Sequence, residues 1–150
     1  MRTTHRVGIR ALAVVGAVLA LTAGGLGAAN AKEGGAPAIP LNNGQETTGA
    51  HTGASGFFSY TIDGDELCYT LSARNLSEPA VAAHIHLAPR HVAGDIVIPL
   101  MVGSGTSWTV ETCTTASATL LADVAASPGD YYVNVHTPTF PGGEIRGQLK

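Results

Sequence analysis

Two histidines one residue apart are the first residues in this sequence whose types and spacing could do chemistry. His84 and His86 lie in a stretch of otherwise apolar character. The residues that alternate with them are Val81, Ala83, Ile85 and Leu87. In a β-strand successive side chains point to opposite faces, so we expect the apolar set to face a core. His84 and His86 would then share the other face, with Cβ atoms roughly 7 Å apart.

A third histidine follows the same rule in a second segment. In Tyr132-Val133-Asn134-Val135-His136 the two valines are expected to face the core. Asn134 and His136 would then point outward. If the two strands are neighbours, His84, His86 and His136 collect on one patch.

Imidazoles gathered on one face suit Zn²⁺ or Cu²⁺. A set of three histidines with one open position is typical of a catalytic metal centre rather than a structural one. The sequence therefore allows a Cu or Zn cofactor held by His84, His86 and His136. The alternative is a polar network in which the imidazoles bond to backbone carbonyl groups.

Charged residues close to His136 favour the network. In the stretch 144–149, Ile145 and Leu149 are predicted to point inward, which leaves Glu144 and Arg146 on the outer face. A hairpin over 138–143 would bring them beside His136. The expected acceptors for the Arg146 fork are Glu144, Asp95 or a backbone carbonyl of the loop after His86. With Asn134 these residues form the predicted structural network, and a nearby guanidinium disfavours a bound cation.

Other signatures of catalysis are missing from the sequence. It contains no Gly-x-Ser-x-Gly elbow, no phosphate-binding Gly-x-x-x-x-Gly-Lys, no Cys-x-x-Cys and no His-Glu-x-x-His. Asp63 and Asp65 flank Gly64 and are typical of a hairpin turn rather than of paired catalytic carboxylates. The sequence thus favours a protein that is not an enzyme.

The elements that must position these residues are predicted to be short strands separated by turns. This pattern is typical of an all-β sandwich or barrel. We expect strands at 38–41, 57–62, 67–73, 81–87, 96–100, 108–113, 131–136 and 144–149. The segment 117–126 places Leu120, Leu121 and Val124 at helical spacing, which predicts one short helix crossing between sheets.

Two cysteines, Cys68 and Cys113, fall on outward-facing positions of their predicted strands. A single disulfide between neighbouring strands is the simplest interpretation in an exported chain. Two free thiols, or half of a metal site, are the alternatives.

The N-terminus has the three-part pattern of a secretory signal peptide. Arg2, Arg6 and Arg10 precede an apolar run over 11–26, and Ala29-Asn30-Ala31 has the form of a signal peptidase site. The run is shorter than the 18 to 20 or so residues of a membrane span, although an uncleaved anchor is the alternative. We therefore expect a signal peptide over 1–31, a short leader over 32–38 and one domain over 39–150.

Removal of this signal would leave an acidic chain of 119 residues. It would take with it three of the eight Lys and Arg residues and none of the eleven Asp and Glu residues, so the formal charge becomes −6. Nucleic acid and anionic membranes attract clustered Lys or Arg. We therefore expect a secreted, extracellular protein that binds neither nucleic acid nor, after cleavage, a membrane.

Three blocks of the sequence together resemble the CHRD domain, which is named for chordin. They are Ala83-His84-Ile85-His86, the stretch 132–137 and the closing stretch 141–149, Pro-Gly-Gly-Glu-Ile-Arg-Gly-Gln-Leu. The resemblance extends from about Ile39 to Leu149. One departure is Leu87-Ala88-Pro89, where the family usually has Gly-Pro after the second His.

This resemblance implies an extracellular, immunoglobulin-like antiparallel β-sandwich, and it implies little chemistry. We therefore expect a non-catalytic binding or structural module whose partner is an unknown extracellular protein or surface ligand. The alternative is a transition-metal protein using His84, His86 and His136. A His-x-His pair on a sandwich strand also looks faintly like copper/zinc superoxide dismutase, an analogy of fold alone.

Overall fold

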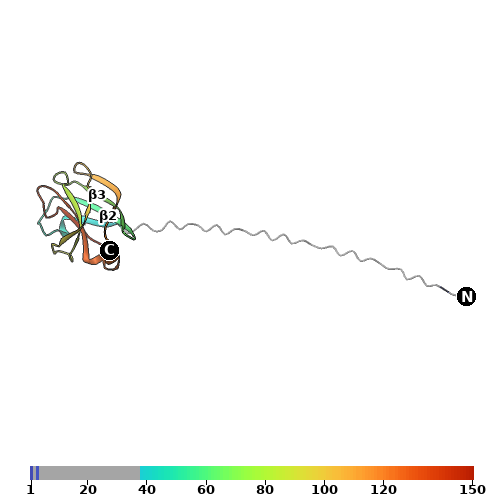
Figure 1. Ribbon diagram of the computed structural model, residues 1–150. Coiled ribbons are helices and arrows are strands. Elements are labelled where there is room, and N and C mark those ends of the chain that lie inside the picture. Colours follow the sequence, from blue (N-terminus) through green and yellow to red (C-terminus); the bar gives the residue numbers. More distant parts are fainter. Residues whose placement is uncertain (2, 4–37) are drawn as a thin grey trace. The chain divides into compact units, whose positions relative to one another are not determined.

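Eight strands and one short helix make up the part of the chain that the computed structural model describes, which is residues 38–150 with Met1 and Thr3. Apart from Met1 and Thr3, the predicted signal peptide lies outside the described residues. The strands are β1 Ile39–Asn42, β2 Ser55–Asp63, β3 Glu66–Arg74, β4 Ala82–Leu87, β5 Asp95–Leu100, β6 Trp108–Thr115, β7 Tyr131–His136 and β8 Ile145–Gln148. Each predicted strand is present, so the all-β class is confirmed (Figure 1).

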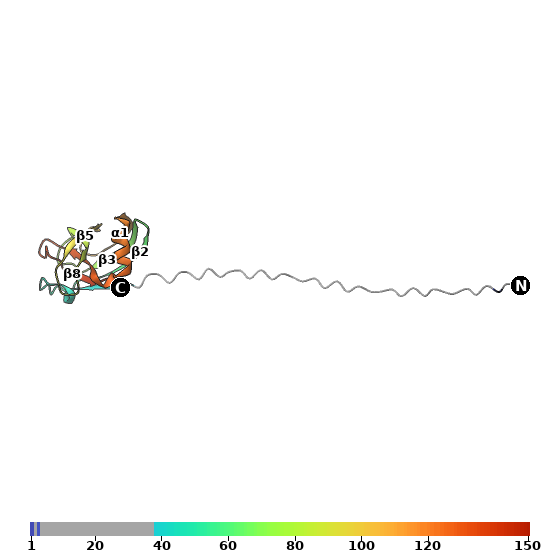
Figure 2. The ribbon, with the colours of Figure 1, turned by 60° about the horizontal axis from the view of Figure 1, so that its bottom comes forward.

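The strands form one antiparallel sheet in the order β5-β4-β7-β8-β1-β2-β3-β6. Its two halves are β5-β4-β7-β8 and β1-β2-β3-β6, and the hydrogen-bonded register joins them at the pair Asn42 and Arg146. Both halves contribute to one hydrophobic core, as the layers of a sandwich do (Figures 1 and 2). The strands that carry the histidines, β4 and β7, are direct neighbours, with His84 opposite Asn134 and His86 opposite Tyr132.

Alternation along the strands decides which side chains enter the core. Phe58, Leu67, Leu71, Ala83 and Val133 are fully buried, and each follows the period-two pattern of its strand. Val81 and Leu87 do not follow the prediction: they are 61% and 48% exposed. Val81 precedes β4 and Leu87 ends it, so both lie where the strand extends beyond the packed layer.

The helix α1 Ala118–Ala126 links β6, at one edge of the sheet, to β7 in the other half. The side chain of Ser117 caps it by accepting a hydrogen bond from the backbone N–H of Leu120. Leu121 and Val124 are its buried residues, and the helix lies against β3 (Figure 2). The predicted crossover helix is therefore confirmed. Two short 3₁₀ turns, η1 Asn43–Gln45 and η2 Pro128–Asp130, were not predicted.

The disulfide predicted between Cys68 and Cys113 is present, with a bond length of 2.02 Å. The two residues are direct partners in the register of β3 and β6. They lie on the side of these strands away from the core, as their parity predicts. Among the described residues, no helix is long and apolar enough to cross a membrane.

Candidate functional site

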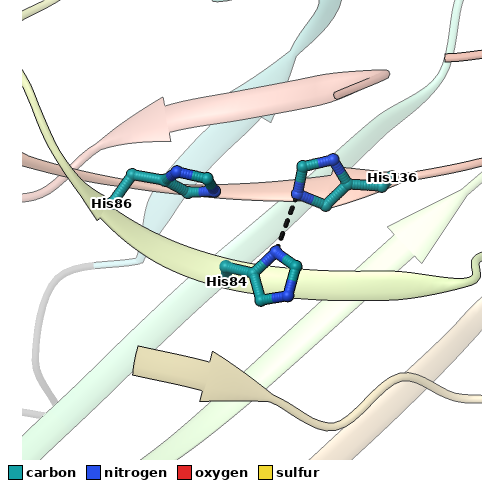
Figure 3. Close-up of side chains that lie close together, drawn as sticks. All are labelled: His84, His86 and His136. Carbon is teal, nitrogen blue, oxygen red and sulfur yellow. Dashed lines mark hydrogen bonds between the residues drawn. The ribbon is translucent and has the colours of Figure 1, made fainter. Parts of the chain in front are cut away.

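The structure brings His84, His86 and His136 together on the face of β4 and β7 that points away from the core. Figure 3 shows the three rings turned toward one another, two from β4 and one from β7. One ring nitrogen from each lies within 4.8 Å of the others, and His84 Nδ1 is 2.9 Å from His136 Nε2. We call these three residues the trihistidine cluster.

Backbone carbonyl groups fix two of the rings. His86 Nδ1 lies 2.9 Å from the carbonyl oxygen of Gly94, and His136 Nδ1 lies 2.9 Å from that of Pro141. A carbonyl oxygen only accepts, so each Nδ1 must carry the hydrogen. The Nε2 atoms of His86 and His136 therefore present lone pairs when the rings are neutral. His86 Nε2 is buried and has no hydrogen-bond partner among the described residues.

Burial keeps the cluster in its neutral form. His86 and His136 are 6% and 7% exposed, whereas His84 is only half-buried. Burial is the main cause that lowers the pKa of His136 to about 4; the hydrogen bond to the Pro141 carbonyl opposes this shift, and the neighbouring His84 and His86 contribute to it. Burial also lowers the pKa values of His84 and His86. Neutral imidazole is the form that binds a metal ion.

The face that carries the cluster is covered rather than solvated. Asn134, Glu144 and Arg146 are all fully buried on it. One covering segment is the loop 88–94, whose carbonyl groups bond to side chains of β8. The other is the stretch 43–52, in which Asn43 donates to the backbone and Thr52 to the side chain of Glu144. Strand parity identified these side chains correctly, but the covering loops turn a surface patch into a buried polar layer.

Arg146 holds the loop 88–94 from beneath. Its guanidinium donates to the carbonyl oxygens of Pro89 and Val92, each at 2.8 Å, and to Gln148 Oε1 at 3.2 Å. It is 1% exposed. Of the acceptors expected for Arg146, the loop carbonyls are therefore the ones in contact, while Glu144 and Asp95 are not among its hydrogen-bond partners in the described part of the chain.

Tyr132 stands between Arg146 and the trihistidine cluster. The guanidinium carbon lies 3.3 Å from the centre of the Tyr132 ring, and the His86 ring stacks on the same phenol at 4.7 Å with an interplanar angle of 6°. Tyr132 belongs to β7, whose neighbours are β4 on one side and β8 on the other. The phenol lies between the guanidinium and His86, and the charge of Arg146 still contributes to lowering the pKa of His86.

Glu144 belongs to a separate set of bonds. Thr52, Ser77 and Thr137 donate hydrogen bonds of 2.6 to 2.8 Å to its two carboxylate oxygens. Burial alone would raise the pKa of Glu144, but these donors outweigh that effect and hold its pKa below the usual value. These hydrogen bonds connect Glu144, the residue before β8, to the loops 43–52 and 75–81.

Glu46 is a residue of this layer that the sequence did not predict. Burial raises its pKa to about 7, although Arg146, Asn134 and the Thr47 amide each lower it in part. Glu46 follows a short 3₁₀ turn and belongs to no strand pattern, so parity gives no signal for it. Gln148 follows the outward parity of Glu144 and Arg146, and Tyr132, which the sequence did not assign to the site, lies on the same face as Asn134 and His136.

The arrangement is suited to binding a transition metal ion. His86 and His136 carry lone pairs on Nε2, and the more exposed His84, whose Nδ1 donates to His136 Nε2, offers Nδ1 once its proton moves to Nε2. Two Nδ1–H groups bonded to carbonyl oxygens match the outer contacts that metal-binding histidines usually make. Hydrogen bonding of His86 and His136 to carbonyl groups also agrees with the alternative, a structural polar network.

Comparison with known proteins gives one family. The sequence model of the CHRD domain matches residues 38–149. No curated protein and no solved structure matches.

Proposed function

The chain belongs to the CHRD domain family, and we propose that it is a secreted, non-catalytic module that binds one Zn²⁺ or Cu²⁺ ion through the trihistidine cluster. The observation that carries the proposal is the convergence of one ring nitrogen from each histidine within 4.8 Å. Secretion is supported by the signal-like N-terminus and by the disulfide, which is typical of oxidising compartments.

The distances support coordination with little rearrangement. Two nitrogen ligands at about 2.0 to 2.1 Å from one tetrahedral zinc ion are roughly 3.3 Å apart. His84 Nδ1 and His136 Nε2 are 2.9 Å apart as hydrogen-bond partners. An ion would take the place of this hydrogen bond after a small rotation of His84, the least buried of the three, with the proton of His84 Nδ1 moving to Nε2 of the same ring.

Isothermal titration calorimetry with Zn²⁺ and Cu²⁺ tests this proposal. We expect one ion per chain and at least about tenfold weaker binding in His136→Ala. Loss of a residue that only hydrogen-bonds to a metal ligand already costs about tenfold, so loss of the ligand itself should cost no less. His51→Ala is the matched control, because His51 is exposed and outside the cluster. Equal affinity in both variants would contradict the proposal. Metal-dependent turnover that His86→Ala abolishes would contradict its non-catalytic part.

A second candidate function, binding of an extracellular protein, is favoured by the way the loop 88–94 is held. The carbonyl groups of Ala88, Pro89, Val92 and Gly94 all accept hydrogen bonds from side chains beneath the loop. The loop's own side chains at 90–92 remain exposed. A loop fixed before binding loses little conformational entropy when a partner docks.

The loop can be tested without knowledge of the partner. Immobilised wild-type domain is compared with a variant carrying Arg90→Ser and Val92→Ser for retention of proteins from the surrounding medium. A protein retained by the wild type and lost by the variant supports this second function. Identical retention by both contradicts it.

A further inference from the structure

The polar layer beside the trihistidine cluster contains buried acceptor atoms that have no donor. Within the described residues, Glu46 Oε1, Asn134 Oδ1 and His86 Nε2 are all buried without a hydrogen-bond partner, as is one donor of the same layer, Arg146 Nε. An unpaired buried acceptor costs roughly 1 to 3 kcal/mol, so several together require a reason.

Asn134 connects the other two groups. It lies opposite His84 in the register of β4 and β7, and opposite Arg146 in that of β7 and β8. Asn134 Nδ2 and Glu46 Oε1 both lie beside Gly143, where an added Cβ would overlap the two of them. Asn134 Nδ2 donates to the carbonyl of Gly142 at 3.3 Å, which fixes the orientation of the amide.

A metal ion at the cluster would add two positive charges to a layer that already contains Arg146. The three imidazoles are neutral and offset none of this charge. Glu144 is occupied by Thr52, Ser77 and Thr137. Glu46 has a buried oxygen without a donor among the described residues and an amide between it and the cluster.

We infer that Glu46 is the counter-charge of the metal site, a positioning residue that acts through Asn134 and becomes ionised when the ion binds. This inference rests on the proposed metal-binding function. As the ion enters, three imidazole nitrogens bind it, the His84–His136 hydrogen bond breaks and the His84 proton moves to Nε2 of the same ring, so the one proton lost to solvent comes from the carboxyl group of Glu46. The groups facing Glu46 are Asn134 on β7 and Arg146 on β8, with His86 on β4 beyond the amide.

The experiment measures Zn²⁺ affinity and proton release by calorimetry at pH 6 and pH 8, in buffers that differ in ionisation enthalpy. At pH 6 the metal-free protein holds Glu46 protonated, because burial raises its pKa to about 7. We expect the wild type to release about one more proton at pH 6 than Glu46→Gln, and both to release similar numbers at pH 8. At pH 8 we expect Glu46→Gln to bind Zn²⁺ about tenfold more weakly.

Glu111→Gln is the matched control, because Glu111 is an exposed residue of β6 in the other half of the sheet. Glu46→Asp, which keeps the charge, should retain the extra proton and most of the affinity. If Glu46→Gln does not fold, loss of the pH-dependent proton release in Glu46→Asp overturns the inference.

Two failures are distinguishable. The first is that the wild type binds Zn²⁺ and that Glu46→Gln has the same affinity at pH 8 and the same proton release at pH 6. This result overturns the role of Glu46 and leaves the proposed function intact. Absence of Zn²⁺ binding by the wild type overturns both.

Discussion

Arg146 is a buried cation whose acceptors carry no full negative charge. Its guanidinium bonds to the carbonyl oxygens of Pro89 and Val92 and packs on the ring of Tyr132. Both carbonyl groups belong to one loop, and only a planar fork reaches them together. The geometry of Arg146, in addition to its charge, therefore sets the position of the loop.

Arg146→Lys is expected to destabilise the domain by about 2 to 4 kcal/mol. Lysine keeps the charge but loses the fork, and a buried cation is left with fewer hydrogen bonds. Chemical denaturation of the two proteins measures the difference. Arg74→Lys, at an exposed position of β3, should change stability by less than about 0.5 kcal/mol. Equal melting temperatures for wild type and Arg146→Lys would mean that the fork does not hold the loop.

Glu46 makes the metal-free protein less stable as the pH rises. Its pKa is about 7 in the folded protein against the ordinary 4.5, so the folded state binds the proton more tightly than the unfolded state. Its contribution to stability is therefore present below pH 4.5 and is lost as the pH rises toward 7.

Glu46→Gln removes the pH dependence, because glutamine stays neutral and avoids the cost of a buried carboxylate. Above pH 7, where Glu46 is ionised, we expect the variant to be more stable than the wild type by about 2 kcal/mol after allowance for partial exposure. Denaturant unfolding at pH 5 and pH 8, after treatment with a chelator, gives both values. A difference between the two proteins that does not change with pH would show that Glu46 titrates normally.

At the scale of elements, the site depends on a hairpin and two loops as much as on the strands. The hairpin between β7 and β8 supplies the carbonyl groups of Pro141 and Gly142, which orient His136 and Asn134. Gly143 in this hairpin has a φ of 125°, a value that favours glycine. A Cβ there would also overlap Glu46 and the amide of Asn134.

Gly143→Ala is expected to cost about 1 to 3 kcal/mol of stability through backbone strain alone. It should also weaken metal binding by displacing Asn134. Gly129→Ala is the matched control, since that position has no positive φ and open space around it. Thermal melts and the zinc titration check both effects, and similar behaviour of the two variants would contradict this role of the hairpin.

Period-two alternation predicts the strands and the shared face of His84, His86 and His136, because both follow from local backbone geometry. It does not predict that this face is buried. The loop 88–94 and the segment 43–52 cover it through contacts between residues far apart in sequence. Glu46 lies in such a segment, so no local pattern identifies it. Val81 and Leu87 were expected to face the core but are exposed, because Val81 precedes β4 and Leu87 is its last residue.

At the scale of the whole molecule, the disulfide and the trihistidine cluster lie in different halves of the sheet. Cys68 and Cys113 join β3 to β6, while the histidines lie on β4 and β7. The bond spans a sequence separation of 45 residues. We therefore expect it to stabilise the fold without taking part in the site.

Replacement of both cysteines with serine should lower the free energy of unfolding by about 4 kcal/mol, the chain-entropy value for a loop of this length. Zinc affinity at a temperature where the variant remains folded should stay within about twofold of wild type, because separated sites rarely couple. Denaturant unfolding and calorimetry give the two numbers. A large loss of zinc affinity in the folded variant would show that the two halves are coupled.

X-ray absorption at the zinc edge of the zinc-loaded domain tests the central claim most directly, because it reports the atoms bound to the ion. The trihistidine cluster predicts three imidazole nitrogens at about 2.0 to 2.1 Å and one further light ligand. A spectrum with one imidazole or none, a shell dominated by oxygen, or sulfur at about 2.3 Å would contradict it.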